Sequence, residues 1–160
     1  MTGFSIRRAT AGDEDLVLTL LYELAEYEKL THAFKLTKAT LARDFFGPAP
    51  LAFCDLAYRD REPVGLATWY WTYASFAAAR GLYLEDLYVR PSMRGHGFGK
   101  ALLALLAKEA RASGAVRVEW SVLNWNKPSI EFYERLGARP NTEWTIYRLD
   151  GNALETLAVS

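Results

Sequence analysis

Short segments rich in apolar residues, several with polar residues at alternate positions, are interspersed with segments whose leucines recur every three or four positions. The first pattern predicts β-strands and the second predicts amphipathic α-helices. We expect strands near residues 4–6, 51–58, 64–73, 82–89, 116–122 and 145–149. We expect helices near residues 13–29, 38–46, 97–112 and 126–136. This mixed order along the chain predicts an α/β fold of the α+β kind.

Local signals mark the ends of several expected helices. Thr10, followed by Asp13 three residues later, predicts the N-terminal cap of the first helix. Asn126 is the expected cap of the last helix, and Pro128 is tolerated there because it falls in the first turn. Gly114 is expected to end the helix before it.

The composition is that of a globular protein, and we expect a single domain over residues 1–160. The 160 residues are 51% hydrophobic and 24% charged, and they contain no linker, repeat or low-complexity segment. The 19 basic and 19 acidic side chains give a formal net charge of zero. This balance argues against a nucleic-acid partner held by a broad cationic surface.

Few residues are available for metal or disulfide chemistry. Cys54 is the only cysteine, and His32 and His96 are the only histidines. An intrachain disulfide and a cysteine-based zinc cluster are excluded, and we expect no metal. The first ten residues lack a basic segment followed by an apolar run, and no apolar stretch approaches the roughly 20 residues that span a bilayer. We therefore expect a soluble cytoplasmic protein without a membrane partner.

A glycine-rich turn precedes the helix expected at 97–112. Three glycines occur in five residues: Gly95, Gly97 and Gly99. Glycine leaves backbone N–H groups uncovered, and a helix N-terminus carries partial positive charge, so the turn is suited to a pyrophosphate. No acidic residue occurs between positions 87 and 108, whereas three basic residues cluster at the turn: Arg90, Arg94 and Lys100. The alternative is a tight loop with solvated basic side chains.

Two common phosphate-binding motifs fit this turn poorly. The P-loop requires G-x-x-x-x-G-K-[ST], but Arg94 stands at its first glycine position and Ala101 follows the lysine. The dinucleotide fingerprint requires a third glycine where Lys100 stands. The turn therefore indicates a different phosphate ligand.

Residues 94–99 fit the motif R/Q-x-x-G-x-G/A and, with the strand before them, resemble the GNAT superfamily of N-acetyltransferases. Other segments resemble the diamine acetyltransferase branch, which acts on spermidine, spermine or thialysine: residues 23–28, 83–86, 126–129 and 132–133. The resemblance covers nearly the whole chain. It implies the GNAT fold, a mixed and mostly antiparallel twisted sheet flanked by helices, with a splayed strand pair that binds acetyl-CoA.

The resemblance also implies where the cosubstrate acetyl-CoA binds. The turn would hold its pyrophosphate through Arg94, Gly95, His96, Gly97, Phe98, Gly99 and Lys100. The backbone of the preceding strand would hold the pantetheine arm and the acetyl group at Leu87, Tyr88 and Val89. The start of the last helix would complete the site with Asn126, Lys127, Pro128 and Ser129.

Acetyl transfer to an amine needs a group that removes a proton, because a free alkyl ammonium has a pKa of roughly 10.4. Glu85 is the candidate, since it stands in an otherwise apolar strand where a charge is costly. The alternative is that Glu85 and Asp86 pair with nearby arginine or lysine side chains. Regular alternation along the strand would turn Asp86 to the opposite side, so we expect no catalytic role for it.

The resemblance assigns two further groups to the reaction. The backbone N–H of Val89 would stabilise the oxyanion of the tetrahedral intermediate. Tyr133 would protonate the departing thiolate, whose conjugate thiol has a pKa of about 8.5. Spacing alone leaves the role of Tyr133 open, because Ile130, Tyr133 and Leu136 share a helical face that is typical of a core.

Four acidic or aromatic residues are candidates for binding the amine, and Glu85 is one of them. Glu28 shares the apolar face of the first expected helix, so it suggests a cationic partner. That partner is the substrate or an internal side chain such as Lys29 or Arg43. In the resembled branch the pair Tyr27-Glu28 contacts the amine, and Glu119 is a further candidate because its strand flanks the acceptor groove.

The segment before the strand at 82–89 bears on the acceptor. Polyamine-acetylating members are acidic there, whereas residues 73–80 contain no acid and one arginine. This difference favours a small thialysine-like or lysine-like acceptor over spermine or spermidine. The leading hypothesis is direct transfer from acetyl-CoA to a primary amine of a small cationic molecule, which is a thialysine-like amino acid, a diamine or a polyamine.

Two other functions remain open at this point. A non-catalytic coenzyme A-binding regulatory module would keep the glycine turn without needing Glu85 and Tyr133. A protein or peptide N-acetyltransferase would use the same catalytic groups and would need an open acceptor groove. The resembled family commonly forms homodimers, and the resemblance implies one here.

Overall fold

The computed structural model describes residues 3–160, and the chain forms two compact units, Met1–Ser121 and Val122–Ser160. The strands of the first unit are β1 (Phe4–Arg8), β2 (Phe53–Arg59), β3 (Glu62–Ala74), β4 (Ala79–Val89) and β5 (Val118–Glu119). Its helices are α1 (Glu14–Tyr27), α2 (Lys38–Asp44) and α3 (Phe98–Ala112), with short 3-10 helices at Thr31–Ala33, Ser75–Ala77 and Pro91–Met93. The second unit contains α4 (Lys127–Arg135) and α5 (Gly151–Ala158).

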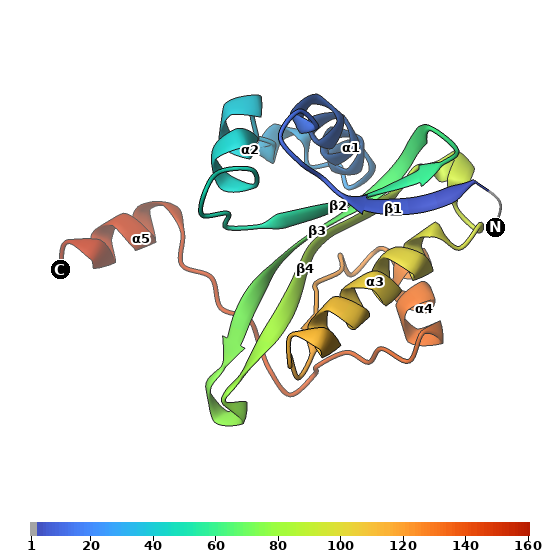
Figure 1. Ribbon diagram of the computed structural model, residues 1–160. Coiled ribbons are helices and arrows are strands. Elements are labelled where there is room, and N and C mark those ends of the chain that lie inside the picture. Colours follow the sequence, from blue (N-terminus) through green and yellow to red (C-terminus); the bar gives the residue numbers. More distant parts are fainter. Residues whose placement is uncertain (1–2) are drawn as a thin grey trace. The chain divides into compact units, whose positions relative to one another are not determined.

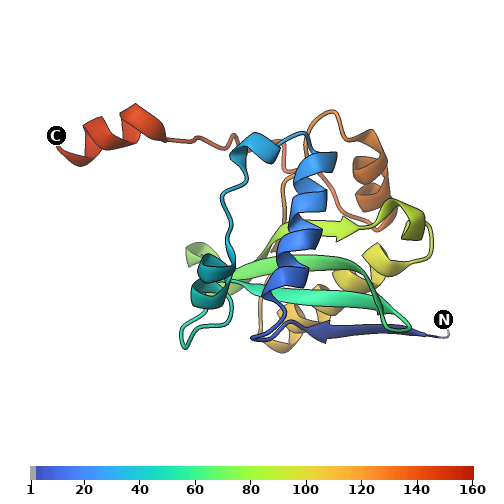
Figure 2. The same cartoon turned by 90° about the horizontal axis from the view of Figure 1, so that it is seen from above.

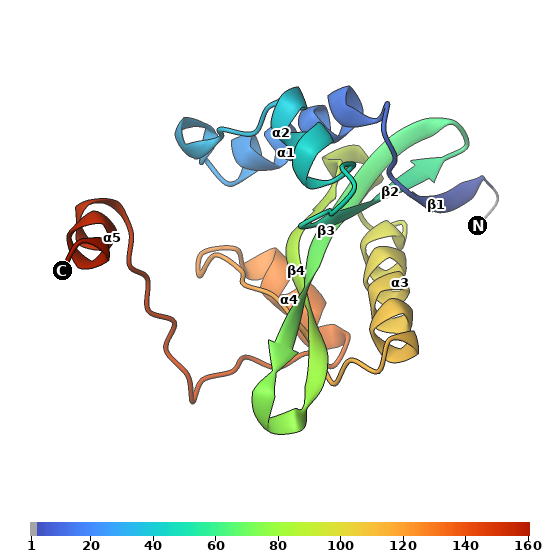
Figure 3. The ribbon, with the colours of Figure 1, turned by 60° about the vertical axis from the view of Figure 1, so that its left-hand side comes forward.

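The strands of the first unit form one sheet in the order β1-β2-β3-β4-β5 (Figure 1). Neighbouring strands are antiparallel except β4 and β5, which are parallel. The hairpin of β3 and β4 extends beyond the other strands (Figure 3). β5 is shorter than the strand expected at 116–122 and pairs with β4 only at Leu82 and Tyr83. Beyond Tyr83 the pairing stops because β5 ends at Glu119, and the sheet is mixed and mostly antiparallel, as the resemblance implies.

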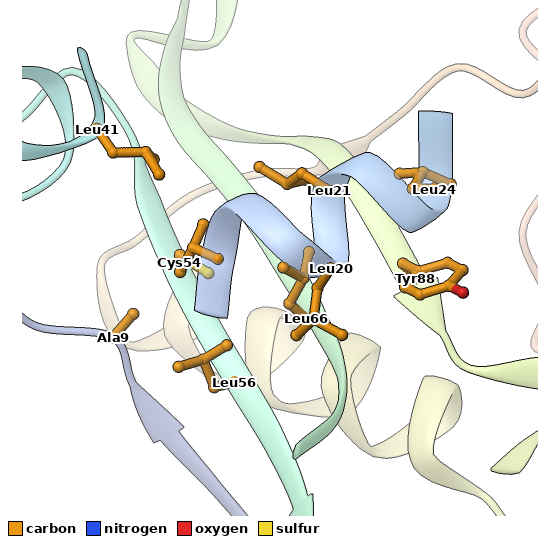
Figure 4. Close-up of a cluster of buried hydrophobic side chains, with 10 residues drawn as sticks. Ala9, Leu20, Leu21, Leu24, Leu41, Cys54, Leu56, Leu66 and Tyr88 are labelled. Atoms are coloured by element: carbon orange, nitrogen blue, oxygen red, sulfur yellow. The ribbon is translucent and has the colours of Figure 1, made fainter. Parts of the chain in front are cut away.

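Helices cover both faces of the sheet, with α1 and α2 on one face and α3 on the other (Figures 1 and 2). Beneath α1 lies the α1-side core, part of which is drawn in Figure 4: Ala9, Val17, Leu20, Leu21, Leu24, Leu41, Cys54, Leu56, Leu66 and Tyr88. Beneath α3 lies the α3-side core: Ala57, Val64, Ala67, Trp69, Leu82, Leu84, Phe98, Leu102, Leu106 and Ala110. On β3, Leu66 lies in the α1-side core and its neighbour Ala67 in the α3-side core, as a pleated strand requires. Val64 lies in the α3-side core although it is two residues from Leu66, because the register between β2 and β3 shifts at this point.

Leu20 tests how strongly the α1-side core stabilises the fold. Its side chain is fully buried at the centre of that core. Leu20→Ala is expected to lower the free energy of unfolding by roughly 2–5 kcal/mol, because transfer energy is lost and a cavity remains. Urea denaturation measures the change. Leu51→Ala is the matched control, because Leu51 is 72% exposed; an equal loss in both variants would contradict the burial assigned to Leu20.

The start of α1 differs from the sequence expectation. The helix begins at Glu14 with Asp13, not Thr10, at the cap position. The Asp13 carboxylate accepts a hydrogen bond from the backbone N–H of Thr10 at 2.8 Å and pairs with Nη1 of Arg7 at 2.7 Å. The hydrogen bond from Arg7 lowers the pKa of Asp13 to about 2. The carboxylate is therefore used to fix the loop before the helix.

The second unit confirms one sequence expectation and corrects another. Asn126 caps α4 as expected, and its side-chain oxygen accepts from the backbone N–H of Ser129 at 3.4 Å. The strand expected at 145–149 is wrong, because residues 122–160 form no strand and Ile146 and Tyr147 are exposed. A single strand would leave its backbone N–H and C=O groups unpaired, and this unit offers none to pair with. α5 forms in the tail, where the pattern predicts no element.

Candidate active site

The glycine turn joins β4 to α3 and leaves the N-terminus of α3 open. Gly97 stands at the cap position with a φ of 87°, and Gly95 has a φ of 77°, values that residues with a Cβ rarely adopt. Among the described residues, none but its chain neighbours comes within 4 Å of where a Cβ on Gly95 would lie. No side chain caps α3. Its first N–H groups can therefore bind an anion in that space.

The side chains of the turn divide into one anchor and several exposed groups. Phe98 is buried in the α3-side core with its ring 5.0 Å from that of Phe4, so only its backbone can face a ligand. His96 is exposed, and its Nδ1 lies 2.9 Å from the carbonyl oxygen of Arg94. Lys100 is also exposed, in the first turn of α3. The turn thus offers backbone N–H groups flanked by the basic side chains of Arg94 and Lys100.

Two arginines in the segment that follows β4 contact residues of α1. Nη2 of Arg90 lies 2.8 Å from Oε1 of Glu23, so Arg90 ties β4 to α1 and does not belong to the open positive charge of the turn. Arg94 donates from Nε to the carbonyl oxygen of Val89 at 2.9 Å, and its guanidinium lies 4.6 Å from the centre of the Tyr27 ring. This cation–π contact joins the glycine turn to the C-terminal end of α1.

The last residues of β4, Leu87, Tyr88 and Val89, pair with β3 and lie beyond the end of the β5 pairing. Leu87 and Val89 pack against the α3-side core, whereas Tyr88 is buried in the α1-side core. Because these side chains are held in the cores, this segment can offer a ligand its backbone N–H and C=O groups. An extended ligand that carries amide groups could form hydrogen bonds with this backbone in the way that an added β-strand pairs with the edge of a sheet.

A β-bulge in β4 turns two acidic residues to the same face of the sheet. Thr68 pairs with Asp86 and Trp69 with Leu84, so Glu85 is the extra residue. Leu84 packs in the α3-side core, which turns Glu85 toward the α1 side. Asp86 is on that side too, because it accepts a hydrogen bond from the hydroxyl of Thr68, whose neighbour Trp69 is in the α3-side core. The expectation that Asp86 faces away from Glu85 is therefore wrong, since alternation does not continue through a bulge.

Glu28, Glu85 and Asp86 form an acid cluster on the α1 side of the sheet. Burial raises the pKa of Asp86 to about 6, the Thr68 hydroxyl opposes this shift, and the charges of Glu85 and Glu28 add to it. Burial also raises the pKa of Glu28. Within residues 3–160 none of the three carboxylates forms an ion pair. Arg43, one of the internal partners considered for Glu28, pairs instead with Asp44 at 2.6 Å.

Glu119 differs from the acid cluster. It lies on β5 opposite Tyr83, and its carboxylate is 2.6 Å from Nε of Arg117. Its charge therefore has an internal partner. The hydroxyl of Tyr83 lies 2.8 Å from that of Ser121, and its ring stacks on Tyr70 with centroids 5.3 Å apart. This tyrosine pair borders Glu85, whose charge contributes to the raised pKa of Tyr70 after the larger effect of burial.

The remaining sequence candidates lie in the second unit. Asn126 is buried at the cap of α4, and the first turn of that helix contains Lys127, Pro128 and Ser129. Tyr133 lies further along α4 with its ring 5.3 Å from that of Phe132. The structure describes these residues within their own unit, and their roles stay predictions.

The described residues also bear on metal binding, cysteine chemistry and membrane insertion. Among residues 3–160 no three His, Cys, Asp or Glu side chains are grouped so that they could hold a metal ion. Cys54 is buried in the α1-side core, where burial raises the pKa of its thiol, so it is a packing residue. No helix in the same residues has the length and apolar character needed to cross a membrane.

Comparison with known proteins agrees with this geometry. Residues 17–138 match the acetyltransferase (GNAT) family. Thialysine N-epsilon-acetyltransferase of Bos taurus is 37% identical over 164 residues, which cover 96% of each chain. L-ornithine N5-acetyltransferase of Arabidopsis thaliana is 32% identical and matches 95% of this chain and 86% of its own. An integron cassette protein from the mobile metagenome of V. cholerae has a TM-score of 0.85 at 26% identity over 100% of both chains.

The family match spans most of the chain, and relatives above 30% identity cover nearly all of it. The mostly antiparallel sheet, the open helix N-terminus and the glycine motif are the features that the sequence resemblance implies. The protein is thus an acetyltransferase, and the chain belongs to the GNAT family.

Proposed function

We propose that this acetyltransferase transfers the acetyl group of acetyl-CoA directly to a primary amine of a small cationic acceptor, with a thialysine-like amino acid as the preferred class. The observation that carries the proposal is the acid cluster: Glu85 and Asp86 on β4, which leads into the glycine turn, and Glu28 at the end of α1. Within residues 3–160 none of the three carboxylates forms an ion pair. A cationic acceptor would compensate this charge. Relatives named for acetylating thialysine and L-ornithine support the same class.

The coenzyme site follows from the open end of α3. The pyrophosphate would bind the N–H groups of the turn at Gly95–Lys100, with Arg94 and Lys100 adding positive charge. The pantetheine arm would lie along the backbone of Leu87, Tyr88 and Val89, where β4 no longer pairs with β5. Family resemblance adds the first turn of α4, through Asn126–Ser129, to this site.

The reaction then needs one base, one oxyanion donor and one acid. Glu85 is exposed on β4 and would take the proton of the acceptor ammonium. The neutral amine attacks the thioester carbonyl, a C–N bond forms, and the backbone N–H of Val89 would stabilise the oxyanion. The C–S bond breaks, and Tyr133 would give its proton to the departing coenzyme A thiolate.

The size of the acceptor follows from the β3–β4 hairpin. Residues 73–80 carry no carboxylate, and both of their aromatic side chains, Tyr73 and Phe76, are exposed. A long polycation would therefore meet no negative charge from residues 73–80 at the end of this hairpin. We propose that the enzyme prefers an acceptor of the length of thialysine or ornithine to spermidine or spermine.

The release of coenzyme A thiol tests this function directly. Acetyl-CoA is offered with thialysine, lysine, ornithine, spermidine, spermine, short diamines and a basic peptide, and we expect fastest turnover with an amino acid or a short diamine. Binding of acetyl-CoA without turnover of any amine would favour a coenzyme A-binding regulatory module. Selective turnover of the peptide would favour a protein acetyltransferase.

Glu28→Gln tests the amine end of the site. The variant is expected to raise the KM for the acceptor roughly 10-fold, because it removes one charge from the acid cluster, and to leave the Kd of acetyl-CoA unchanged. Steady-state kinetics and calorimetry measure the two constants. Glu26→Gln is the matched control on the same helix, since Glu26 is exposed. An unchanged KM in Glu28→Gln would make Glu28 a structural residue.

Three broader expectations belong to the same proposal. The family resemblance favours a homodimer, which light scattering of the purified protein would test. The composition along the chain favours a single functional domain over residues 1–160, and a cytoplasmic location belongs to the same proposal. Glu119 remains a candidate amine-binding residue, although its ion pair with Arg117 would have to open first.

A further inference from the structure

We propose that Asp86 is a specificity residue of this site, whose carboxylate receives a second cationic group of the acceptor, one that is not acetylated. The proposal rests on the proposed function, because it concerns the same acceptor. Asp86 has no role in the assignment made from the sequence, which places it on the wrong side of β4. Three observations support the proposal: its missing counter-ion, the bulge beside it and the protonation state of the reacting amine.

The first observation is a contrast between two aspartates of the same sheet. Asp55 is buried on β2 and fully partnered, since it lies 2.8 Å from Nε of Arg8 and accepts from Nε1 of Trp69 at 2.8 Å. Asp86 is partly buried on β4 and accepts one hydrogen bond, from the hydroxyl of Thr68. Asp55 has the cation and donor that a structural carboxylate needs, whereas Asp86 has no ion pair within residues 3–160.

The charged groups around Asp86 increase the need for a cation. Glu28 on α1 and Glu85 on β4 both repel its charge. Cys54 on β2 is a further titratable neighbour, and its thiol is neutral because burial, and to a smaller extent the charges of Asp55 and Asp86, raise its pKa. Within residues 3–160 the Thr68 hydroxyl donates to the carboxylate but no cationic side chain forms an ion pair with it, so a ligand that brings positive charge is the partner that this environment favours.

The second observation is the bulge at Glu85. Without the extra residue, Asp86 would point with Leu84 into the α3-side core. The bulge turns it to the α1 side, next to Glu85. Bulges commonly re-aim a side chain beside an active site, and here the re-aimed group is a partly buried carboxylate without an ion pair in the described part of the chain.

The third observation is chemical. The nitrogen that attacks acetyl-CoA must be neutral, so in the reactive complex it cannot compensate the acid cluster. A second group that keeps its proton, such as a distal ammonium, can do so throughout the reaction. Glu85, whose side chain is exposed, serves the first nitrogen. Asp86, which is partly buried, is left for the second group. An acceptor with one amine lacks that interaction.

A matched pair of amines tests this assignment. Cadaverine and n-pentylamine have the same carbon chain, and calorimetry with coenzyme A present gives their Kd with or without turnover. Wild-type protein is expected to bind cadaverine at least 30-fold more tightly, and Asp86→Asn to lose roughly 30-fold for cadaverine and less than about 3-fold for n-pentylamine. Asp86→Glu, which keeps the charge, is expected to restore most of the difference. Asp60→Asn is the matched control in an exposed turn.

The outcomes separate this proposal from the proposed function. Equal binding of the two amines by wild-type protein, or equal losses for both in Asp86→Asn, would overturn the role of Asp86. Either result can occur in an enzyme that still acetylates amines. A protein that acetylates none of the acceptors would refute the proposed function instead, while the binding comparison would still decide whether Asp86 selects dications.

Stability gives a second readout that a merely structural role would not produce. Because the pKa of Asp86 is raised from 3.8 to about 6 by burial, its charged form is disfavoured in the folded state. Its contribution to stability is full below about pH 4 and is lost as the pH rises through about 6. Asp86→Asn is therefore expected to unfold at a higher temperature than wild type at neutral pH, with no difference near pH 4. A lower Tm at neutral pH would mark Asp86 as structural.

Discussion

Tyr133→Phe is expected to lower kcat by roughly 10²–10³ while the Kd of acetyl-CoA stays within about 2-fold, because a general acid contributes on that order to a rate. The substitution removes one hydroxyl and keeps the ring, so its packing beside Phe132 is preserved. Thiol release under saturating substrates gives kcat, and calorimetry gives the Kd. The deficit is expected to narrow above about pH 8.5, where the departing thiolate is stable without a proton.

Tyr147→Phe is the matched control for this change. Tyr147 lies in the same unit and is 92% exposed, and its substitution by phenylalanine removes the same group, one hydroxyl. We expect its kcat to equal that of wild type. Unaltered turnover of Tyr133→Phe would remove Tyr133 as the acid and leave it as a packing residue of α4, the alternative that its helical spacing already allows.

Most of the first unit could be predicted from local sequence patterns. The strands at β2, β3 and β4 and the helices α1, α2 and α3 follow from apolar runs, periodicity and glycines that are visible in short windows. The strand expected at 145–149 fails for a reason that no short window contains. A strand is stable only with a partner, and the second unit has none for Ile146 and Tyr147.

The candidate site was harder to predict than the fold. The glycine turn is a contiguous motif, so its position could be read directly. Glu85 and Asp86 face the same side of the sheet because of a one-residue register shift opposite Thr68 and Trp69. The regular alternation of a strand does not predict such a shift. Arg90 looked like part of the coenzyme charge because its partner, Glu23, is 67 residues away in sequence. Two consecutive acids in an apolar strand were the one local hint that the strand is irregular there.

Arg94 belongs both to the contiguous glycine motif and to the contacts that form only in the folded chain. It belongs to the glycine motif, yet it stacks on Tyr27 at the end of α1 and donates to the carbonyl of Val89. The turn proposed to bind the coenzyme and the end of α1 proposed to bind the amine therefore share one side chain. A residue of the motif thus bears on both proposed ligands, which the linear motif alone does not show.

Glu85→Gln is expected to lower kcat/KM for a cationic acceptor by roughly 10²–10⁴, the range that a general base contributes. Glutamine keeps the shape of the side chain at the bulge, but it cannot take the proton of the ammonium. The neutral fraction of an alkyl amine rises about 10-fold per pH unit below its pKa of roughly 10.4, so the deficit should shrink as the assay pH is raised. Glu62→Gln, an exposed acid on β3, is the matched control and should behave like wild type. A deficit that stays constant with pH would show that Glu85 binds the acceptor without accepting its proton, and the base would then have to be a water molecule or another member of the acid cluster.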